Sequence, residues 1–117
     1  METKVHIGKK GEEIALAYLM NEGMRFVAAN VHCGHNEIDL ILRDGVYYVF
    51  VEVKARMDTE YGLPREYVTP AKQKRIVKAA RQYLYENGLT EAYVRFDVTE
   101  VYLKNGKVCH FRDAFRA

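Results

Sequence analysis

The residues with the clearest capacity for chemistry are three carboxylates and a lysine: Glu37, Asp39, Glu52 and Lys54. Carboxylate oxygens are preferred ligands of Mg²⁺, which often binds through only one or two of them. Carboxylates that stand close together repel one another, and one becomes protonated unless a cation lies between them. If the fold gathers these side chains, the chemistry to expect is the binding of a divalent metal ion.

A β-hairpin must position these residues. Asp44-Gly45 separates two apolar runs, and such a dipeptide is a strong hairpin signal because both central residues of a type I′ turn need positive φ. With Asp44 and Gly45 as the two loop residues, Arg43 faces Val46. Continuing this register predicts the pairs Asp39 with Phe50, Glu37 with Glu52, and His35 with Lys54.

Strand periodicity then sorts the side chains, because directly paired residues share a face of the sheet. One face is predicted to carry Ile38, Leu40, Leu42, Tyr47, Val49 and Val51. The other is predicted to gather Glu37, Asp39, Glu52 and Lys54 beside Ile41, Tyr48 and Phe50. Asp39 is then diagonal to Glu52, with Cβ atoms about 7 Å apart. The apolar neighbours predict that both faces are covered; the alternative is a solvated face whose charges keep the hairpin soluble.

The composition is that of a single globular domain. The chain has 117 residues, a hydrophobic content of 49% and a net charge of +2, so a basic surface requires segregation of charge. Residues 1–10 contain no apolar segment of a signal peptide, and no apolar run reaches the length of a membrane span. Cys33 and Cys109 fit a reducing cytosol better than a disulfide framework. We therefore expect one domain, residues 1–117, located in the cytoplasm.

A first helix is predicted at residues 5–22. Gly8, Glu12, Ala15 and Leu19 fall on one stripe of this helix. The small residues Gly8 and Ala15 would allow close packing against another element. Glu12 is directed inward on the stripe, which gives it a functional interpretation; the alternative is that it only stabilises the helix N-terminus through the macrodipole.

A second helix is predicted at residues 70–86, with Thr69 as its N-cap and Asn87-Gly88 as its stop. Gln73 extends the apolar stripe of this helix and should point at the sheet. The helix is also the most basic segment of the chain, through Lys72, Lys74, Arg75, Lys78 and Arg81. Such a run is by itself more typical of a solvated face than of a binding surface.

Three further strands are predicted, at residues 24–33, 92–103 and 107–111, and a polar loop at residues 55–67. The order of elements is therefore α-β-β-β-α-β-β. In this order the aspartate lies on one strand of the hairpin and the Glu-x-Lys sequence on the other, after one helix and before the next.

Asp39 followed by Glu52-Val53-Lys54 matches the D-(x)n-(D/E)-x-K signature of the PD-(D/E)xK nucleases, whose core has the order α-β-β-β-α-β. Over about residues 8–101 the chain also resembles the YraN family, small bacterial proteins predicted to be endonucleases related to archaeal Holliday-junction resolvases. The matching segments are Gly8-x-x-Gly11-Glu12-x-x-Ala15, Asn30, Glu37-Ile38-Asp39-Leu40-Ile41, Phe50-Val51-Glu52-Val53-Lys54-x-Arg56, Tyr61-Gly62, Val68-Thr69-x-x-Lys72-Gln73 and Arg95-Phe96-Asp97-Val98. Asn36 departs from the family, which usually has glycine there.

The resemblance implies a restriction-endonuclease-like α/β fold, with a mixed central sheet flanked by two helices and an extra C-terminal strand. It implies a metal-dependent endonuclease that acts on structured nucleic acid, with branched DNA as one candidate, DNA preferred to RNA, and Mg²⁺ or Mn²⁺ as cofactor. A resolvase needs two active sites, so a homodimer is a further expectation. No membrane partner is expected.

The same resemblance assigns roles to individual residues. The metal ion would be bound by Asp39, Glu52, the Val53 carbonyl and Glu12. Lys54 would orient the attacking water or stabilise the phosphorane, and Gln73 would hydrogen-bond Lys54 or the phosphate. Glu37 would support the ligands or contact the metal. The nucleic-acid backbone would be held by Arg56, Arg65, Lys72, Lys74 and Lys78.

Two other interpretations remain open. The first is a nucleic-acid-binding module with a vestigial nuclease site, in which the basic residues bind without cleavage. The second is a zinc-stabilised structural protein, which requires the last strand to lie beside the segment before the hairpin. Its ligands would come from His32, Cys33, His35, Cys109 and His110, although their spacing matches no recognised zinc motif.

Overall fold

The computed structural model describes residues 4–57 and 68–117. Within these residues it contains two helices and five strands in the predicted order. The helices are α1 (Lys4–Asn21) and α2 (Pro70–Glu86), and the strands are β1 (Arg25–Cys33), β2 (Asn36–Asp44), β3 (Tyr47–Arg56), β4 (Tyr93–Tyr102) and β5 (Lys107–Phe115). The predicted α/β fold with an extra C-terminal strand is confirmed. None of the described helices is long and apolar enough to cross a membrane.

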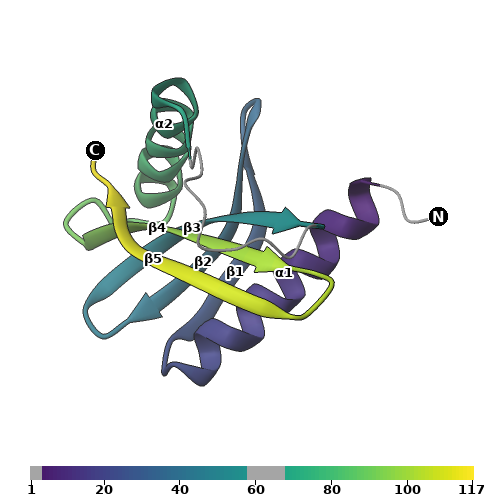
Figure 1. Ribbon diagram of the computed structural model, residues 1–117. Coiled ribbons are helices and arrows are strands. Elements are labelled where there is room, and N and C mark those ends of the chain that lie inside the picture. The colour runs from purple at the N-terminus through teal and green to yellow at the C-terminus, as the bar shows by residue number, and fades with distance from the viewer. Residues whose placement is uncertain (1–3, 58–67) are drawn as a thin grey trace.

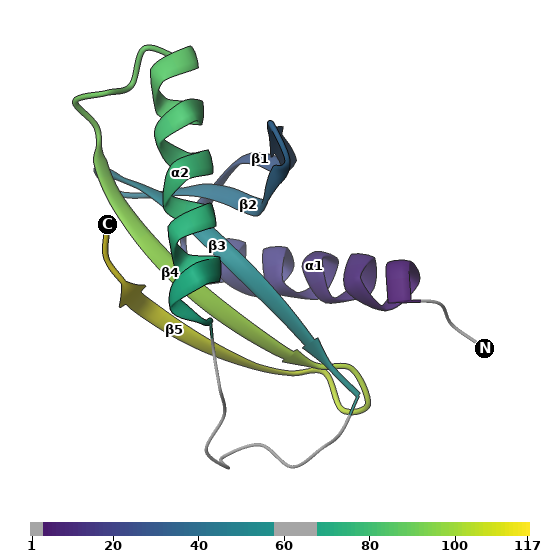
Figure 2. The ribbon, with the colours of Figure 1, turned by 90° about the horizontal axis from the view of Figure 1, so that it is seen from above.

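The strands form one mixed sheet in the order β1-β2-β3-β4-β5. Neighbouring strands are antiparallel except β3 and β4, which are parallel and are connected through α2. The two helices pack on opposite faces of the sheet (Figures 1 and 2). On the α1 side Leu19 packs in a cluster with Leu42 and Val49, whereas on the α2 side Ile41 and Phe50 are covered. The hairpin strands are therefore buried on both faces, as predicted.

Helix α2 begins and ends at the predicted residues. Thr69 is the N-cap, and its Oγ1 accepts a hydrogen bond from the backbone N–H of Lys72 at 3.2 Å. Pro70 occupies the first helical turn, where its missing N–H removes no helical hydrogen bond. Asn87 is the C-cap, and Gly88 follows with a φ of 66°. These local signals fix where the basic helix begins and ends.

The packing stripe of α1 includes Ala15 and Leu19, which were predicted and are completely buried, but its glycine differs from the predicted one. Gly11, rather than Gly8, is buried against the sheet, and Leu19 lies on the same stripe. A Cβ atom added to Gly11 would lie 2.9 Å from Ala55 Cβ, whereas one added to Gly8 would meet no atom within 4 Å. Because Gly11 has no side chain, α1 can approach β3 closely, and this approach carries the next residue, Glu12, to the sheet.

Alanine substitutions at these two glycines should change stability in opposite directions. Gly8→Ala should stabilise the protein by about 0.5–1 kcal/mol, because alanine is the better helix former and finds free space. Gly11→Ala gains the same propensity but crowds Ala55, whose Cβ moves only with its backbone, so a net loss of about 1–2 kcal/mol is expected. Urea denaturation of both variants measures the two changes. A gain in stability for Gly11→Ala would contradict the close approach.

The hairpin has a different register from the predicted one. The observed pairs include Ile41 with Phe50 and Asp44 with Tyr47, so the loop residues are Gly45 and Val46 rather than Asp44 and Gly45. In this loop only Gly45 has a positive φ, 59°, which fits a type II′ turn with glycine first. The predicted pairs Asp39 with Phe50, Glu37 with Glu52 and His35 with Lys54 are therefore wrong. The error is two residues, so the predicted faces are largely kept.

Two side chains depart from the predicted apolar face. Ile38 is buried in the cluster on the α2 side, and Tyr47 is 40% exposed at the end of the sheet. Asn30, on the partner strand β1, has a left-handed φ of 51° close to this point. A residue in that conformation interrupts the regular pleat, so simple alternation does not hold across it.

Strand β5 continues past the predicted end at residue 111, and its pairing with β4 shifts register around Asp97. Asp97 is completely buried. Its carboxylate accepts hydrogen bonds from Arg95 Nε at 2.9 Å and Nη2 at 3.0 Å, and from the backbone N–H of Asp113 at 3.0 Å. His110 Nε2 lies 2.7 Å from Asp97 Oδ2. Burial alone would raise the pKa of Asp97, but these donors hold that pKa below its usual value.

The strand order contradicts the zinc interpretation. His32, Cys33 and His35 lie at the end of the β1–β2 hairpin, whereas Cys109 and His110 lie on β5, at the opposite edge of the sheet. Both cysteines are free, and His110 is paired with a buried aspartate. These five side chains therefore cannot meet around one ion.

Candidate functional site

The candidate site lies where β2 and β3 separate. Their pairing ends at Leu40 and Val51; beyond this point β3 remains paired with β4, and β2 remains paired with β1 (Figure 2). The backbone N–H of Val53 donates instead to Asp39 Oδ2 at 2.8 Å. The Asp39 carboxylate thus accepts a backbone hydrogen bond that a paired strand would otherwise accept.

The observed register brings Asp39 closer to Glu52 than the predicted diagonal. Extended by one step past Leu40 and Val51, it sets the two residues opposite each other, and their carboxyl groups are hydrogen-bonded to each other. Burial, followed by the charge of Asp39, raises the pKa of Glu52 to about 7. Burial and the charge of Glu37 also raise the pKa of Asp39. Without a cation, the pair therefore keeps a proton at pH values at which two separate carboxyl groups would both be ionised.

Two lysines face this pair. Lys72 Nζ, from α2, lies 3.9 Å from Glu52 Oε1. The charge of Lys54, which is half-buried on β3, opposes the rise in the pKa of Glu52, so it acts on the same carboxyl group. The arrangement brings two carboxyl groups and two ammonium groups together where β2 and β3 separate, a combination chemically suited to a cation and a phosphate oxygen side by side.

Asn30 links the carboxylate of α1 to the hairpin. Its Nδ2 donates to Glu12 Oε1 at 2.8 Å and to Glu37 Oε1 at 3.0 Å. Burial raises the pKa of Glu12, and the charges of Asp39 and Glu37 add to the rise. The sequence predicted no role for Asn30, which was named only as one of the residues that match the YraN family. The one usable signal was that asparagine tolerates the left-handed conformation adopted here.

Other predicted site residues have different surroundings from those expected. Gln73 Nε2 donates to the Val68 carbonyl at 3.0 Å rather than to Lys54. The guanidinium of Arg56 donates from Nε and Nη2 to Glu100 Oε2, at 3.1 and 2.8 Å, and Glu100 is only 2% exposed. Arg56 is therefore already engaged with a buried carboxylate. The remaining cations are Lys74 and Lys78, which are exposed on α2, and Arg65, which lies outside the described residues.

A metal site is not fully assembled from side chains. In residues 4–57 and 68–117, no group of three or more His, Cys, Asp or Glu side chains is close enough together to hold an ion. Asp39 and Glu52 form a coupled pair, while Glu12 and Glu37 are held by Asn30. Two carboxylates fit Mg²⁺, which keeps several waters and commonly takes only one or two protein carboxylates. The donors present are therefore compatible with a hydrated divalent ion.

The raised pKa of Glu52 predicts a pH-dependent loss of stability. Between pH 4.5 and about 7 the folded chain retains a proton that an unfolded glutamate has released, so stability falls as pH rises through this window. Glu52→Gln cannot titrate, and its amide can still donate to Asp39. The stability of this variant relative to the parent should therefore rise with pH, by up to about 3 kcal/mol.

Urea denaturation in chelator at several pH values measures this difference. Glu13→Gln is the matched control, because it makes the same substitution at an exposed residue of the same molecule and should leave stability close to that of the parent. A Glu52→Gln difference that stays constant with pH would contradict the shared proton.

The fold and the site together define a small mixed α/β protein with a coupled carboxyl pair and adjacent lysines at the point where two strands of its sheet separate. Residues 11–101 match the model of "Uncharacterised protein family UPF0102", and the chain belongs to this family. A UPF0102 protein of Chlorobium phaeobacteroides is 41% identical over 119 aligned residues, covering 95% of this chain and 94% of that protein. One of Chromohalobacter salexigens is 50% identical over 94 residues, covering 80% and 76%. One of Legionella pneumophila is 38% identical over 111 residues, covering 94% of each.

Proposed function

We propose that this protein is a metal-dependent endonuclease that hydrolyses phosphodiester bonds in structured nucleic acid. The observation that carries the proposal is the coupled pair Asp39 and Glu52, with Lys54 and Lys72 beside it. The spacing from Asp39 to Glu52-Val53-Lys54 supports membership of the PD-(D/E)xK nucleases and a relation to archaeal Holliday-junction resolvases. The placement of these residues on two adjacent strands, between α1 and α2, agrees with that proposal.

In this proposal Asp39, Glu52 and the Val53 carbonyl would hold Mg²⁺ or Mn²⁺, with Glu12 as the fourth candidate ligand. The bound ion would supply neutralisation of phosphate charge and a water of lowered pKa. Lys54 would orient the attacking water or stabilise the pentacovalent phosphorus, for which a compact charge on a flexible stem is suited. Lys72, close to Glu52, would bind a phosphate oxygen. Glu37 would act indirectly, because the Asn30 amide that donates to Glu37 also donates to Glu12.

A cleavage screen tests the proposal. The purified protein is incubated with branched, flapped, duplex and single-stranded DNA and RNA, with Mg²⁺, Mn²⁺ or chelator. We expect cleavage of at least one structured substrate with a divalent ion, none in chelator, and none by Lys54→Ala. Lys104→Ala, at an exposed lysine in the β4–β5 turn, is the control and should cleave like the parent. Cleavage that Lys54→Ala retains in full would indicate a contaminating nuclease.

The second candidate is a nucleic-acid-binding module with a vestigial site. It is favoured by one observation, the absence of a three-carboxylate group among the described residues. In that case the parent, Asp39→Asn and Lys54→Ala would bind nucleic acid alike, and none would cleave it in the screen.

A further inference from the structure

The last part of β3 carries charged side chains on one face only. Ala55 is directed toward α1, because a Cβ atom added to Gly11 would lie 2.9 Å from Ala55 Cβ and 3.8 Å from Val53 Cγ1. Successive side chains of a strand alternate between its faces. The opposite face, on the side of α2, therefore carries the charged residues of this segment, Glu52, Lys54 and Arg56. The end of β3 extends beyond the start of α2 (Figure 2).

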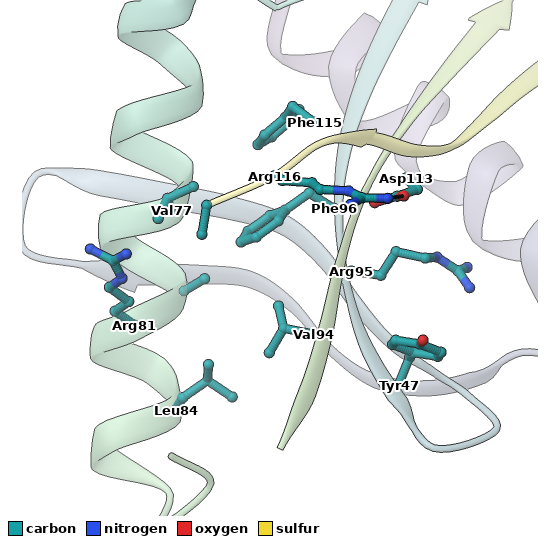
Figure 3. A pocket seen from close by; sticks show the side chains of 12 residues that line it. Tyr47, Val77, Arg81, Leu84, Val94, Arg95, Phe96, Asp113, Phe115 and Arg116 are labelled. Atoms are coloured by element: carbon teal, nitrogen blue, oxygen red, sulfur yellow. Dashed lines mark hydrogen bonds and ion pairs between the residues drawn. The ribbon is translucent and has the colours of Figure 1, made fainter. Parts of the chain in front are cut away.

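The neighbouring strand β4 changes from apolar to charged on the same face of the sheet. Beside the cavity drawn in Figure 3, Val94 and Phe96 are directed toward α2, whereas Arg95 is directed away from it. Val98 continues this row in the core on the α2 side. The next residue of the row is Glu100, which is buried as well. Glu100 is thus an acid at a position where the strand otherwise supplies apolar packing.

Glu100 holds the guanidinium of Arg56 from one side. Arg56 donates to Glu100 Oε2 from Nε at 3.1 Å and from Nη2 at 2.8 Å, and the hydroxyl of Tyr102 donates to Glu100 Oε1 at 3.2 Å. Because both oxygens accept hydrogen bonds, the carboxylate cannot turn without breaking one of them. Arg56 Nη1 has no partner in the part of the chain that the structure describes, and the Arg56 side chain is 25% exposed. Arg56 therefore keeps N–H donors for a ligand.

The register of β3 and β4 brings this guanidinium to the level of Lys54. The parallel pairing sets Lys54 opposite Glu100 and Arg56 opposite Tyr102. Because Arg56 bonds to Glu100, its side chain turns back along the sheet in the direction of Glu52. Lys54 and Arg56 thus present two neighbouring cations next to the carboxylate pair. Like charges on one face repel, and the buried acid beside both of them offsets that repulsion.

A purely structural role for Glu100 explains this arrangement less well. A buried ion pair is often no more stable than apolar side chains of similar volume, because both charges lose their hydration. Val98, the preceding residue on the same face of β4, is buried and apolar. Packing alone therefore does not require an acid at this position, whereas a guanidinium that must stay in one place does.

We propose that Glu100 is a positioning residue of the carboxylate site. It holds Arg56 in place, and Arg56 binds the phosphate next to the one that is cleaved at Asp39 and Glu52. The inference rests on the proposed endonuclease function, in which Lys54 acts at the cleaved phosphate. Lys54 lies between the carboxylate pair and Arg56 along β3, so Arg56 serves the neighbouring phosphate. A planar guanidinium that is fixed on one side can bind phosphate oxygens with its remaining N–H groups.

The first experiment measures binding without cleavage, by fluorescence anisotropy of a labelled flapped DNA duplex in chelator. Glu100→Gln removes a negative charge, which by charge alone would tighten the binding of DNA. Loss of positioning has the opposite sign, and we expect binding about fivefold weaker, the cost of ordering a freed side chain. In the Arg56→Ala background, Glu100→Gln should no longer weaken binding. Glu91→Gln, at an exposed acid just before β4, is the matched control and should bind at least as tightly as the parent.

Arg56→Lys keeps the charge and leaves the buried acid in place. Lysine is a point charge and cannot make two parallel bonds from a planar group, so binding should weaken about fivefold. Arg56→Ala should also reduce the slope of log affinity against log salt by about 0.9, the contribution of one duplex phosphate contact. Arg25→Lys, the same substitution at an exposed residue of β1, should bind like the parent. Urea denaturation of each variant checks that it is folded under the binding conditions.

The second experiment measures cleavage by the same variants with a divalent ion. Glu100→Gln and Arg56→Lys should raise KM about fivefold and leave kcat within about twofold, because a contact with a neighbouring phosphate is equally strong before and during bond cleavage. If Glu100→Gln binds as tightly as the parent, or weakens binding also without Arg56, the role of Glu100 is wrong, and cleavage by the parent would still support the endonuclease proposal. If binding changes as expected but the parent cleaves no substrate, Glu100 positions a nucleic-acid contact and the endonuclease proposal fails. A parent that does not bind the flapped duplex would overturn the assignment of Glu100.

Discussion

Asp39→Asn should abolish cleavage and at the same time make the metal-free protein more stable. Asparagine can still accept the hydrogen bond from the Val53 N–H, because its carbonyl oxygen can replace Asp39 Oδ2. It removes one negative charge from the buried pair with Glu52, which relieves the repulsion that raises both pKa values. Cleavage should fall by more than about 100-fold, the loss that follows from removing even a residue that merely orients a metal ligand.

Thermal denaturation provides the second measurement on this variant. At about 100 times the dissociation constant, Mn²⁺ should stabilise the parent by about 2.7 kcal/mol and raise its Tm by about 10 °C. Asp39→Asn should melt higher than the parent in chelator and show no rise with Mn²⁺. Glu13→Gln, at an exposed acid, should keep both the parent's Tm and its metal response. A metal-induced rise that survives Asp39→Asn would place the ion elsewhere.

Asp97→Asn should have the opposite effect on stability. Asp97 is fully buried and accepts hydrogen bonds from both the side chain of Arg95 and the Asp113 backbone, with His110 at 2.7 Å. An amide presents N–H groups to one of these donors and leaves the guanidinium with only the partly exposed Asp44 as a charge partner. A loss of about 3–5 kcal/mol is expected for a broken buried ion pair, enough to lower the Tm by about 15 °C.

The matched control for Asp97→Asn is Asp44→Asn. Asp44 accepts from the same Arg95, at 2.8 Å, but its side chain is 29% exposed, so the loss should be only about 0–1 kcal/mol. The cost of Asp97→Asn should also shrink in acid, because the stabilisation by a carboxylate with a lowered pKa is lost as the pH falls below 3.8. Equal losses for the two variants would show that burial of Asp97 contributes nothing.

The faces of most hairpin residues could be predicted because they depend only on the two-residue period of a strand; Ile38, close to the left-handed Asn30, is an exception. The register could not, because Asp44-Gly45 suits a type I′ turn whereas Gly45-Val46 suits a type II′ turn, and both are compatible with the flanking apolar runs. The two registers differ by an even number of residues, so Asp39 and Glu52 share a face in either. The candidate site therefore survived an error in the pairing that was used to derive it.

Other features depend on contacts between distant segments and had no local signal. Asp97 looked like one member of an ordinary alternating strand, and only the shifted pairing of β5 buries it. Asn30 acts through two carboxylates, Glu12 and Glu37, that lie on different elements. The close approach at Gly11 depends on Ala55, on another element again. Periodicity describes one segment at a time, so it cannot report these partners.

The topology also sets an order of assembly. Asp39 and Glu52 belong to one hairpin with a two-residue loop, whereas Lys72 reaches Glu52 only after α2 has packed against the sheet. Hairpins close within about 1–10 μs, and pairing across a long connection is slower. The acids therefore meet during folding with Lys54 of the same hairpin but before Lys72 arrives. Refolding should accordingly be faster in mild acid, or with a divalent ion, than in chelator at neutral pH.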